Sequence, residues 1–118
     1  MLKRVKRRYL AIEIDSAEAF DSRELIEALW KAIEKLYGEY GASKTGLNLI
    51  AYDPDKKRLI IRVMCSALDM VRAAVASITK INDKPIALHV LTVSGTLKAL
   101  NNKTEKQHQQ HQNTPTMY

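Results

Sequence analysis

The feature that most constrains the fold of this chain is the spacing of its apolar residues, which alternates between two and about three and a half positions. Residues 8–15 (RYLAIEID) carry apolar side chains at every second position, which predicts a strand buried on one face. One face carries Leu10, Ile12 and Ile14, and the other carries Tyr9, Ala11 and Glu13. Residues 21–41 place apolar side chains three or four positions apart, which predicts an amphipathic helix. Its expected cap and end signals are Asp21, Glu24, Gly38 and Gly41.

The second half of the chain repeats this alternation. Residues 47–52 and 58–64 predict two strands joined by the turn DPDKK, residues 66–81 predict a second helix, and residues 86–93 predict a last strand. The order β-α-β-β-α-β indicates an α+β, ferredoxin-like sandwich with a four-stranded antiparallel sheet. Both helices need one face of that sheet, so we expect the other face to be open and a short C-terminal helix to follow the last strand.

Composition divides the 118 residues into three expected segments. We predict a basic N-terminal arm over 1–8, one α/β domain over 9–100 and a disordered polar tail over 101–118, which is rich in Gln and Asn. The tail holds His108 and His111, but no Cys or carboxylate accompanies them, so we expect no metal site. A single cysteine, Cys65, and the lack of a long apolar run predict a cytoplasmic protein.

Charge is distributed unevenly along a chain with a net charge of +6. Five basic residues crowd the N-terminus without an acidic neighbour, whereas residues 13–39 are mainly acidic. The basic residues are Lys3, Arg4, Lys6, Arg7 and Arg8. Such a cluster attracts polyanions, and it lacks the interleaved large apolar residues of a membrane-lying helix, which favours nucleic acid. A solubilising arm without a partner is the alternative.

The stretch LTVSGTLKAL (91–100) ends the last predicted strand with two hydroxyl residues around a glycine. Ser94 alone is sufficient to cap the helix that follows, in which case Gly95 in the first turn is a mild penalty. A glycine also allows close approach of another backbone, and backbone N–H groups bind anions. We therefore expect this stretch to cap the helix. Whether Ser94, Gly95 and Thr96 also contact a phosphate stays open at this point.

The open sheet face offers few aromatic side chains for stacking RNA bases. Tyr9 is the only candidate on the first strand, and the strand at 58–64 has none. That strand alternates Arg58, Ile60, Arg62 and Met64 with an apolar set. Base stacking is therefore disfavoured, and an apolar face edged by arginines suits a protein partner or a phosphate backbone better. No recognised catalytic motif is present, and we assign no catalytic residue.

Four segments together resemble the ribonuclease P protein component 2 family, the archaeal relatives of eukaryotic Pop-five. They are KRRYLAIEI, ELIEALWKAIEKLYGEYGAS, LIIRV and LTVSGTLKAL, and the similarity runs from about residue 5 to residue 100. The resemblance implies an RRM-like sandwich that lacks the aromatic RNA-binding signature. It also implies a subunit of ribonuclease P, in which an RNA with bound Mg²⁺ removes the 5′ leader from precursor tRNA. The protein itself is then expected to bind no cofactor.

The family resemblance also implies partners, which are ribonuclease P RNA, precursor tRNA, ribonuclease P protein component 3 and a second copy of the chain. We expect RNA contacts from Lys3, Arg4, Lys6, Arg7 and Arg8, and weaker ones from Arg62, Ser94, Gly95, Thr96 and Lys98. We expect protein contacts from Arg58, Ile60 and Met64. The alternative is an RRM-like adaptor that binds only proteins. A small-molecule site of the acyl-phosphate type ranks last, because the segment after the first strand is acidic and has no glycine.

Overall fold

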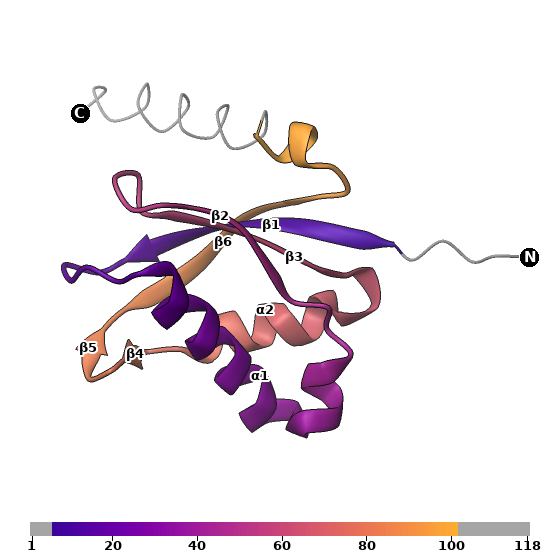
Figure 1. Ribbon diagram of the computed structural model, residues 1–118, viewed down its shortest axis with the longest axis horizontal. Helices are drawn as coiled ribbons and strands as arrows, with labels where there is room; N and C mark the ends of the chain where they lie inside the picture. Colours follow the sequence, from indigo (N-terminus) through magenta and orange to yellow (C-terminus); the bar gives the residue numbers. More distant parts are fainter. Residues whose placement is uncertain (1–5, 102–118) are drawn as a thin grey trace, which may run out of the picture.

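The computed structural model describes residues 6–101 and has at its centre a four-stranded antiparallel sheet in the order β2-β3-β1-β6. The strands are β1 (Arg7–Asp15), β2 (Asn48–Asp53), β3 (Arg58–Met64) and β6 (Ala87–Ser94). Helices α1 (Ser22–Ser43) and α2 (Leu68–Ser77) lie together on one side of this sheet (Figure 1). The predicted ferredoxin-like arrangement is confirmed.

The first helix begins as its sequence indicates. The Glu24 N–H donates to the Asp21 carboxylate (2.7 Å) and the Asp21 N–H donates to the Glu24 carboxylate (3.3 Å), which completes the capping box. Gly38 has a left-handed φ of 77°, as expected, but the helix kinks there and continues to Ser43 instead of ending.

The second helix is shorter than predicted at both ends. A 3-10 turn, η1 (Cys65–Ala67), precedes α2, so the α-helix starts two residues later than predicted. Residues 78–81, expected to be helical, instead lead into a small hairpin of β4 (Lys80–Ile81) and β5 (Lys84–Pro85). Asn82 and Asp83 both have positive φ (52° and 64°), the conformation of the tight turns that fit a hairpin. Local turn chemistry therefore outweighs the helical spacing.

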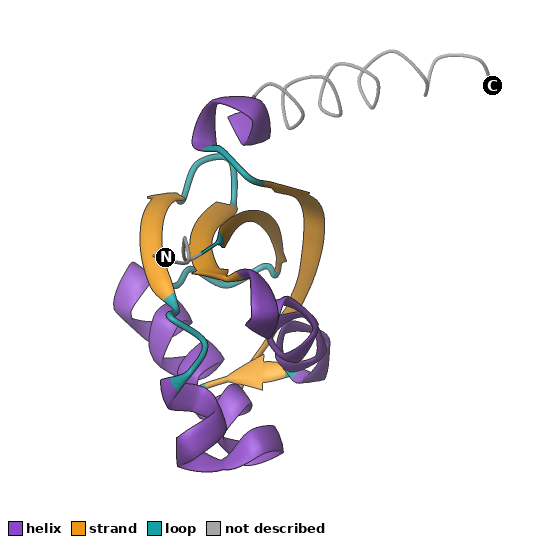
Figure 2. Ribbon diagram, turned by 90° about the vertical axis from the view of Figure 1, so that its right-hand side faces the viewer, coloured by secondary structure: helices purple, strands orange, loops and turns teal. Residues whose placement is uncertain are grey.

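The core lies between the two helices and the facing side of the sheet (Figure 2). Alternate residues of β1 and β3 face the buried stripes of both helices, and each has almost no exposed surface. The largest buried side chains include Leu10, Ile12, Leu25, Leu29, Ile33, Leu59, Ile61, Val63, Val71 and Val75. The expected alternation in both strands is confirmed, because the polar or small neighbours of these residues point to the other face.

The other face of the sheet is partly covered, which corrects the expectation that it is open. Residues 97–101 form a short helix that lies on the opposite side of the sheet from α1 and α2 (Figure 1). Leu100 in this helix is fully buried, and Ala11 on that face of β1 is 1% exposed. Leu97 and Leu100 are one turn apart, so the helix has an apolar side.

Some expectations lie outside the described residues. These are Lys3 and Arg4, most of the proposed arm, and the tail beyond Asn101 with its two histidines. Arg7 and Arg8, which we assigned to the arm, belong to β1. Within residues 6–101, neither helix is long and apolar enough to cross a membrane.

Candidate nucleic-acid interface

The structure brings together two of the predicted phosphate sites. Arg8 Nη1 donates to the Arg7 carbonyl (2.9 Å) and lies 3.6 Å from the position that a Cβ on Gly95 would occupy. The backbone of Lys6 is held at the same end of the sheet, because its carbonyl accepts from the Cys65 N–H (2.8 Å). The start of β1 and the segment after β6, far apart in sequence, therefore form one surface.

The hydroxyl residues around Gly95 cap the short helix, but not as predicted. The Ala99 N–H donates to Thr96 Oγ1 (3.2 Å), so Thr96 and not Ser94 is the capping residue. Ser94 is buried, and its Oγ accepts from the Thr96 N–H (3.4 Å), which holds the preceding turn. Gly95 lies outside the helix, so it carries no helical penalty.

Gly95 is not required by the fold. Its φ is outside the left-handed range, and an added Cβ would meet only Arg8, at an ordinary contact distance of 3.6 Å. The fold would therefore accept a larger residue at this position, which lies on the surface next to the Arg8 guanidinium. It leaves room for a second molecule to approach the backbone closely.

Arg62 lies on the same face as Arg7, one strand away. Its register neighbours are Tyr9 on β1 and Asn48 on β2. Its Nε is buried and has no hydrogen-bond partner in the described part of the chain. Sequence reasoning missed Asn48, because its place opposite Arg62 depends on a register shift at Ile50 that nothing in the sequence announces.

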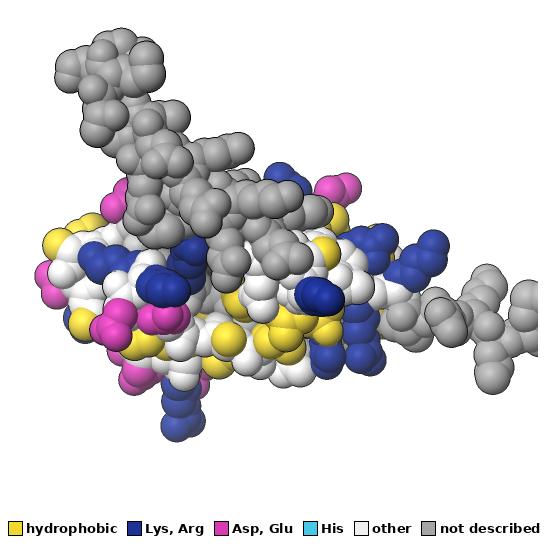
Figure 3. Space-filling view, turned by 90° about the horizontal axis from the view of Figure 1, so that it is seen from above, with side chains coloured by type: hydrophobic (Ala, Val, Ile, Leu, Met, Phe, Trp, Pro, Cys, Tyr) yellow, Lys and Arg dark blue, Asp and Glu magenta, His cyan; other side chains and the backbone are white. Residues whose placement is uncertain are grey.

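We call Lys6, Arg7, Arg8 and Arg62 the basic end of the sheet. Within residues 6–101, none of them has a carboxylate within ion-pair distance; the two ion pairs there are Arg23–Glu27 and His89–Asp15. Figure 3 shows Lys and Arg side chains at the end near the N-terminal trace, whereas most Asp and Glu side chains lie toward the opposite end. Lys98 is exposed on the short helix. Unbalanced positive charge at one end of a sheet suits a polyanion.

The residues predicted for protein contact lie along one face of β3. Arg58 lies between Glu13 and Asp53 in the register, and Ile60 lies beside the buried Ala11. Met64 packs against Gly46, whose added Cβ would lie 2.8 Å from Met64 Cγ. All three predicted side chains are only partly exposed.

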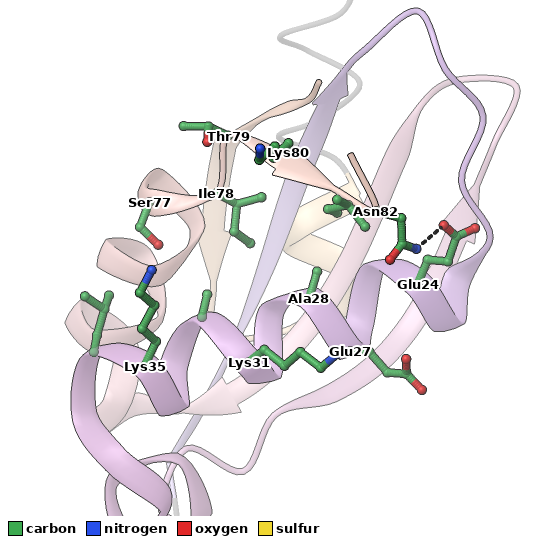
Figure 4. A pocket seen from close by; sticks show the side chains of 13 residues that line it. Glu24, Glu27, Ala28, Lys31, Lys35, Ser77, Ile78, Thr79, Lys80 and Asn82 are labelled. Atoms are coloured by element: carbon green, nitrogen blue, oxygen red, sulfur yellow. Dashed lines mark hydrogen bonds between the residues drawn. The ribbon is translucent and has the colours of Figure 1, made fainter. Parts of the chain in front are cut away.

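Larger apolar side chains are exposed on α1. They are Trp30, Leu36, Tyr37 and Tyr40, of which Tyr40 is 74% exposed. A hollow of about 540 Å³ separates α1 from residues 77–82. In Figure 4, Lys35 points toward Ser77 at one end of this hollow, and Asn82 donates to Glu24 (2.9 Å) at the other. A second hollow of about 300 Å³ is lined by Trp30, Ile26 and Leu47. We call the four exposed residues the α1 surface.

The acidic end of the sheet contains a structural tyrosine. Tyr52 Oη donates to the Phe20 carbonyl (2.6 Å). Burial raises the pKa of Tyr52 above its usual value, and the nearby carboxylates of Asp21 and Glu24 raise it further. Over the residues that the structure describes, no group of three or more His, Cys, Asp or Glu side chains is placed to hold a metal ion.

The fold and this surface define a class of protein, a ferredoxin-like α/β sandwich with a basic end of the sheet that forms no ion pair within the described residues. The comparisons agree with that class. The chain superposes on a chain of the cryo-EM structure of yeast ribonuclease MRP with a TM-score of 0.67, at 17% identity, covering 95% of this chain and 98% of that one. At this identity, the match shows the fold alone.

Sequence comparison gives the family. Residues 8–105 match the profile of the Rpp14/Pop5 family. Over 100 residues, the chain is 35% identical to ribonuclease P protein component 2 of Pyrococcus horikoshii, which covers 85% of this chain and 83% of that protein. It is 32% identical to the protein of the same name from Methanosarcina mazei, with 85% and 84% covered. The chain belongs to the Rpp14/Pop5 family, which confirms the resemblance seen in its sequence motifs.

Proposed function

We propose that this protein is a non-catalytic subunit of ribonuclease P that binds the RNA of that enzyme through the basic end of its sheet. The observation that carries the proposal is the juxtaposition of Arg8 with Gly95 at the basic end of the sheet, whose Lys and Arg side chains form no ion pair within the described residues. The choice of ribonuclease P as the enzyme comes from the names of the relatives. The bound RNA, with Mg²⁺, then removes the 5′ leader from precursor tRNA.

The proposed role is electrostatic. Folding of an RNA brings phosphates together, and cations held on a rigid strand reduce their repulsion. Lys6, Arg7 and Arg8 project from the start of β1, where the sheet register holds their backbone. Gly95 and Thr96 offer a backbone that a phosphate can approach, and Lys98 adds a further charge. Lower repulsion raises the effective affinity of the RNA for Mg²⁺, so the protein matters most when Mg²⁺ is scarce.

We further propose that the α1 surface binds protein. Exposed Trp and Tyr side chains are the usual anchors of protein interfaces, and Trp30 borders a hollow that a partner side chain can fill. Ribonuclease P protein component 3 is the first candidate, with a second copy of the chain as the other. A cytoplasmic ribonucleoprotein is the setting that fits these partners.

The second candidate function is an adaptor that binds only proteins. The exposed Trp and Tyr side chains of α1 favour it, because a protein can bind through them without any RNA contact. In that case the basic end of the sheet is a solubilising surface, and its charges are exchangeable for other polar residues.

Reconstitution of precursor-tRNA cleavage separates the two. Ribonuclease P RNA and component 3 are assayed with and without this chain over a series of Mg²⁺ concentrations. The subunit proposal predicts a higher cleavage rate with the chain at low Mg²⁺ and a difference that narrows as Mg²⁺ rises. Equal rates at every Mg²⁺ concentration would count against it.

A further inference from the structure

Four polar side chains form a line across the sheet from one edge to the other. The register pairs Asn48 on β2 with Arg62 on β3, Arg62 with Tyr9 on β1, and Tyr9 with Ser94 on β6. All four point away from α1 and α2, toward the face that the short helix of residues 97–101 partly covers, because the residues next to them along each strand pack in or against the core. We call this line the polar row.

The chemistry of the polar row is specific. It offers an amide, a guanidinium, a phenol ring and a hydroxyl side by side, about 4.8 Å apart from strand to strand. Asn48 is exposed at the edge, Tyr9 and Arg62 are half-buried, and Ser94 is buried, so the exposure of the row decreases from β2 toward β6. A ligand can therefore reach the row at Asn48 and at the exposed parts of Arg62 and Tyr9.

Arg62 makes a particular demand. Its Nε is buried and lacks a hydrogen-bond partner among residues 6–101, and no carboxylate there pairs with its guanidinium. A buried donor without an acceptor costs stability, and such groups are rare in folded proteins. An acceptor from a bound molecule would satisfy it.

We propose that the polar row binds one unpaired nucleotide of the RNA. The base stacks on the Tyr9 ring, and its edge accepts from Arg62 and pairs with the Asn48 amide, which both donates and accepts. The attached phosphate reaches Arg7, which lies on the same face about 7 Å along β1 from Tyr9. This inference rests on the proposed function. It adds recognition of a base to a surface whose charge alone would bind RNA phosphates whatever the base.

Charge and planarity favour a nucleotide over a protein segment. The row adjoins Lys6, Arg7 and Arg8, so a ligand there needs negative charge as well as a flat polar edge. A nucleotide carries both in one unit, whereas an acidic peptide carries its negative charge and its planar groups on separate residues. The single aromatic ring limits the site to one base, which agrees with the lack of aromatic residues on β3.

The test uses two RNAs that differ only in their bases. One is a stem-loop RNA, and the other is the same stem-loop with every loop nucleotide abasic. We expect the protein to bind the first about tenfold more tightly, in line with the usual energy of one stacked, hydrogen-bonded base. Arg62→Lys, Tyr9→Leu and Asn48→Ala should each reduce that preference about five- to tenfold and leave the salt slope of binding unchanged.

Arg72→Lys is the matched control, because it makes the same exchange on α2, on the far side of the sheet. It should bind both RNAs as the unchanged protein does. Thermal melting of each variant checks the fold, and Arg62→Lys keeps the charge, so a lost preference cannot be assigned to charge or unfolding.

The outcomes separate this inference from the proposed function. If the protein binds both stem-loops equally with a steep salt slope, the polar row does not read a base and the ribonuclease P proposal stands. If it binds neither and cleavage does not need it, both fail. If Arg62→Lys keeps the preference for bases but loses affinity for component 3, the row is a protein contact and the inference is wrong.

Discussion

Arg58 and Arg62 lie on one face of the same strand, yet their surroundings are opposite. Arg58 is flanked in the register by Asp53 and Glu13, so a carboxylate residue lies beside it on both neighbouring strands, although it forms no ion pair within the described residues. Arg62 is flanked by Asn48 and Tyr9, and its Nε has no partner within the described residues. The two ends of the sheet therefore differ in charge: carboxylate residues flank the arginine at one end, and uncharged residues flank the arginine at the other.

Under the proposed function, this difference directs one end of the sheet toward RNA. From Arg7 to Asp15, β1 extends up to about 27 Å at about 3.4 Å per residue. That length is several times the Debye length of about 8 Å at physiological salt, so the two ends act on a ligand independently. An RNA docked at the basic end feels little of the acidic end, which instead repels phosphates that approach the wrong way.

The largest effect is expected from reversing charge at the basic end. Arg7→Glu with Arg8→Glu should weaken binding of ribonuclease P RNA on the order of 100-fold at low salt and make the log–log salt slope less negative by about 1.5 to 2. Filter binding over a potassium chloride series measures both.

Lys56→Glu with Lys57→Glu is the matched control for that charge reversal. It changes the net charge equally, but in the turn at the acidic end, where Lys57 Nζ donates to the Ser16 carbonyl (2.7 Å). Its RNA affinity should fall far less. Equal losses in the two double variants would mean that net charge alone binds RNA and that the two ends are equivalent.

A smaller effect, on a different partner, is expected from the helix layer. Trp30→Ala should lower affinity for ribonuclease P protein component 3 about 30-fold, the cost typical of an interface tryptophan, and leave RNA affinity unchanged. Calorimetric titration measures the first and filter binding the second. Arg23→Ala, at the exposed start of α1, is the control. Loss of RNA binding by Trp30→Ala would contradict the proposal that α1 binds protein while the sheet binds RNA.

Substitutions of two glycines separate an effect on RNA binding from an effect on stability. Gly95→Ala should leave the melting temperature unchanged and weaken RNA binding about fivefold, by roughly 1 kcal/mol, because the methyl group occupies the approach to the backbone. Gly46→Ala should do the reverse, because Gly46 has φ +62° and its added Cβ would lie 2.8 Å from Met64 Cγ. Its cost in stability is expected to be about 1 to 3 kcal/mol. If Gly95→Ala binds RNA as the unchanged protein does, RNA does not approach the protein backbone at Gly95.

The smallest effect concerns the acidic end, where we expect structure without RNA contact. Tyr52→Phe should lower the free energy of unfolding by about 1 kcal/mol through loss of the bond to the Phe20 carbonyl and leave RNA affinity unchanged. The raised pKa of Tyr52 stabilises the fold below its ordinary pKa of 10.0, and that stability is lost as pH rises above it. Denaturant melts from pH 8 to 11 should show a steeper decline for the unchanged protein than for Tyr52→Phe.

Much of the fold could be predicted because it depends on local pattern. Alternation in residues 8–15 and 58–64 gave the buried faces, and the spacing of Leu25, Leu29 and Ile33 gave the first helix. What failed had two causes. Local turn chemistry at Asn82 and Asp83 ended the second helix earlier than its apolar spacing indicates. Leu100 covered a face expected to be open, through a contact with strands that are distant in sequence.

The candidate site was predictable in its parts but not in its assembly. The basic cluster and the Ser94-Gly95-Thr96 stretch are visible in the sequence, whereas the approach of Arg8 to Gly95 follows from the pairing of β1 with β6. Bulges at Ile50 and Leu91 set the register that aligns the polar row. Because a shift of one residue moves a side chain to the other face, a row of this kind is visible only once the register is known.

The central claim is that RNA contacts one end of the sheet, and cross-linking tests it most directly. The protein is bound to ribonuclease P RNA, irradiated with ultraviolet light and digested, and the peptides that carry nucleotides are identified by mass spectrometry. We predict adducts within residues 6–9, 62–64 and 94–98 and none in the turn at 53–57. Adducts concentrated at 53–57, with none at the start of β1, would contradict the account.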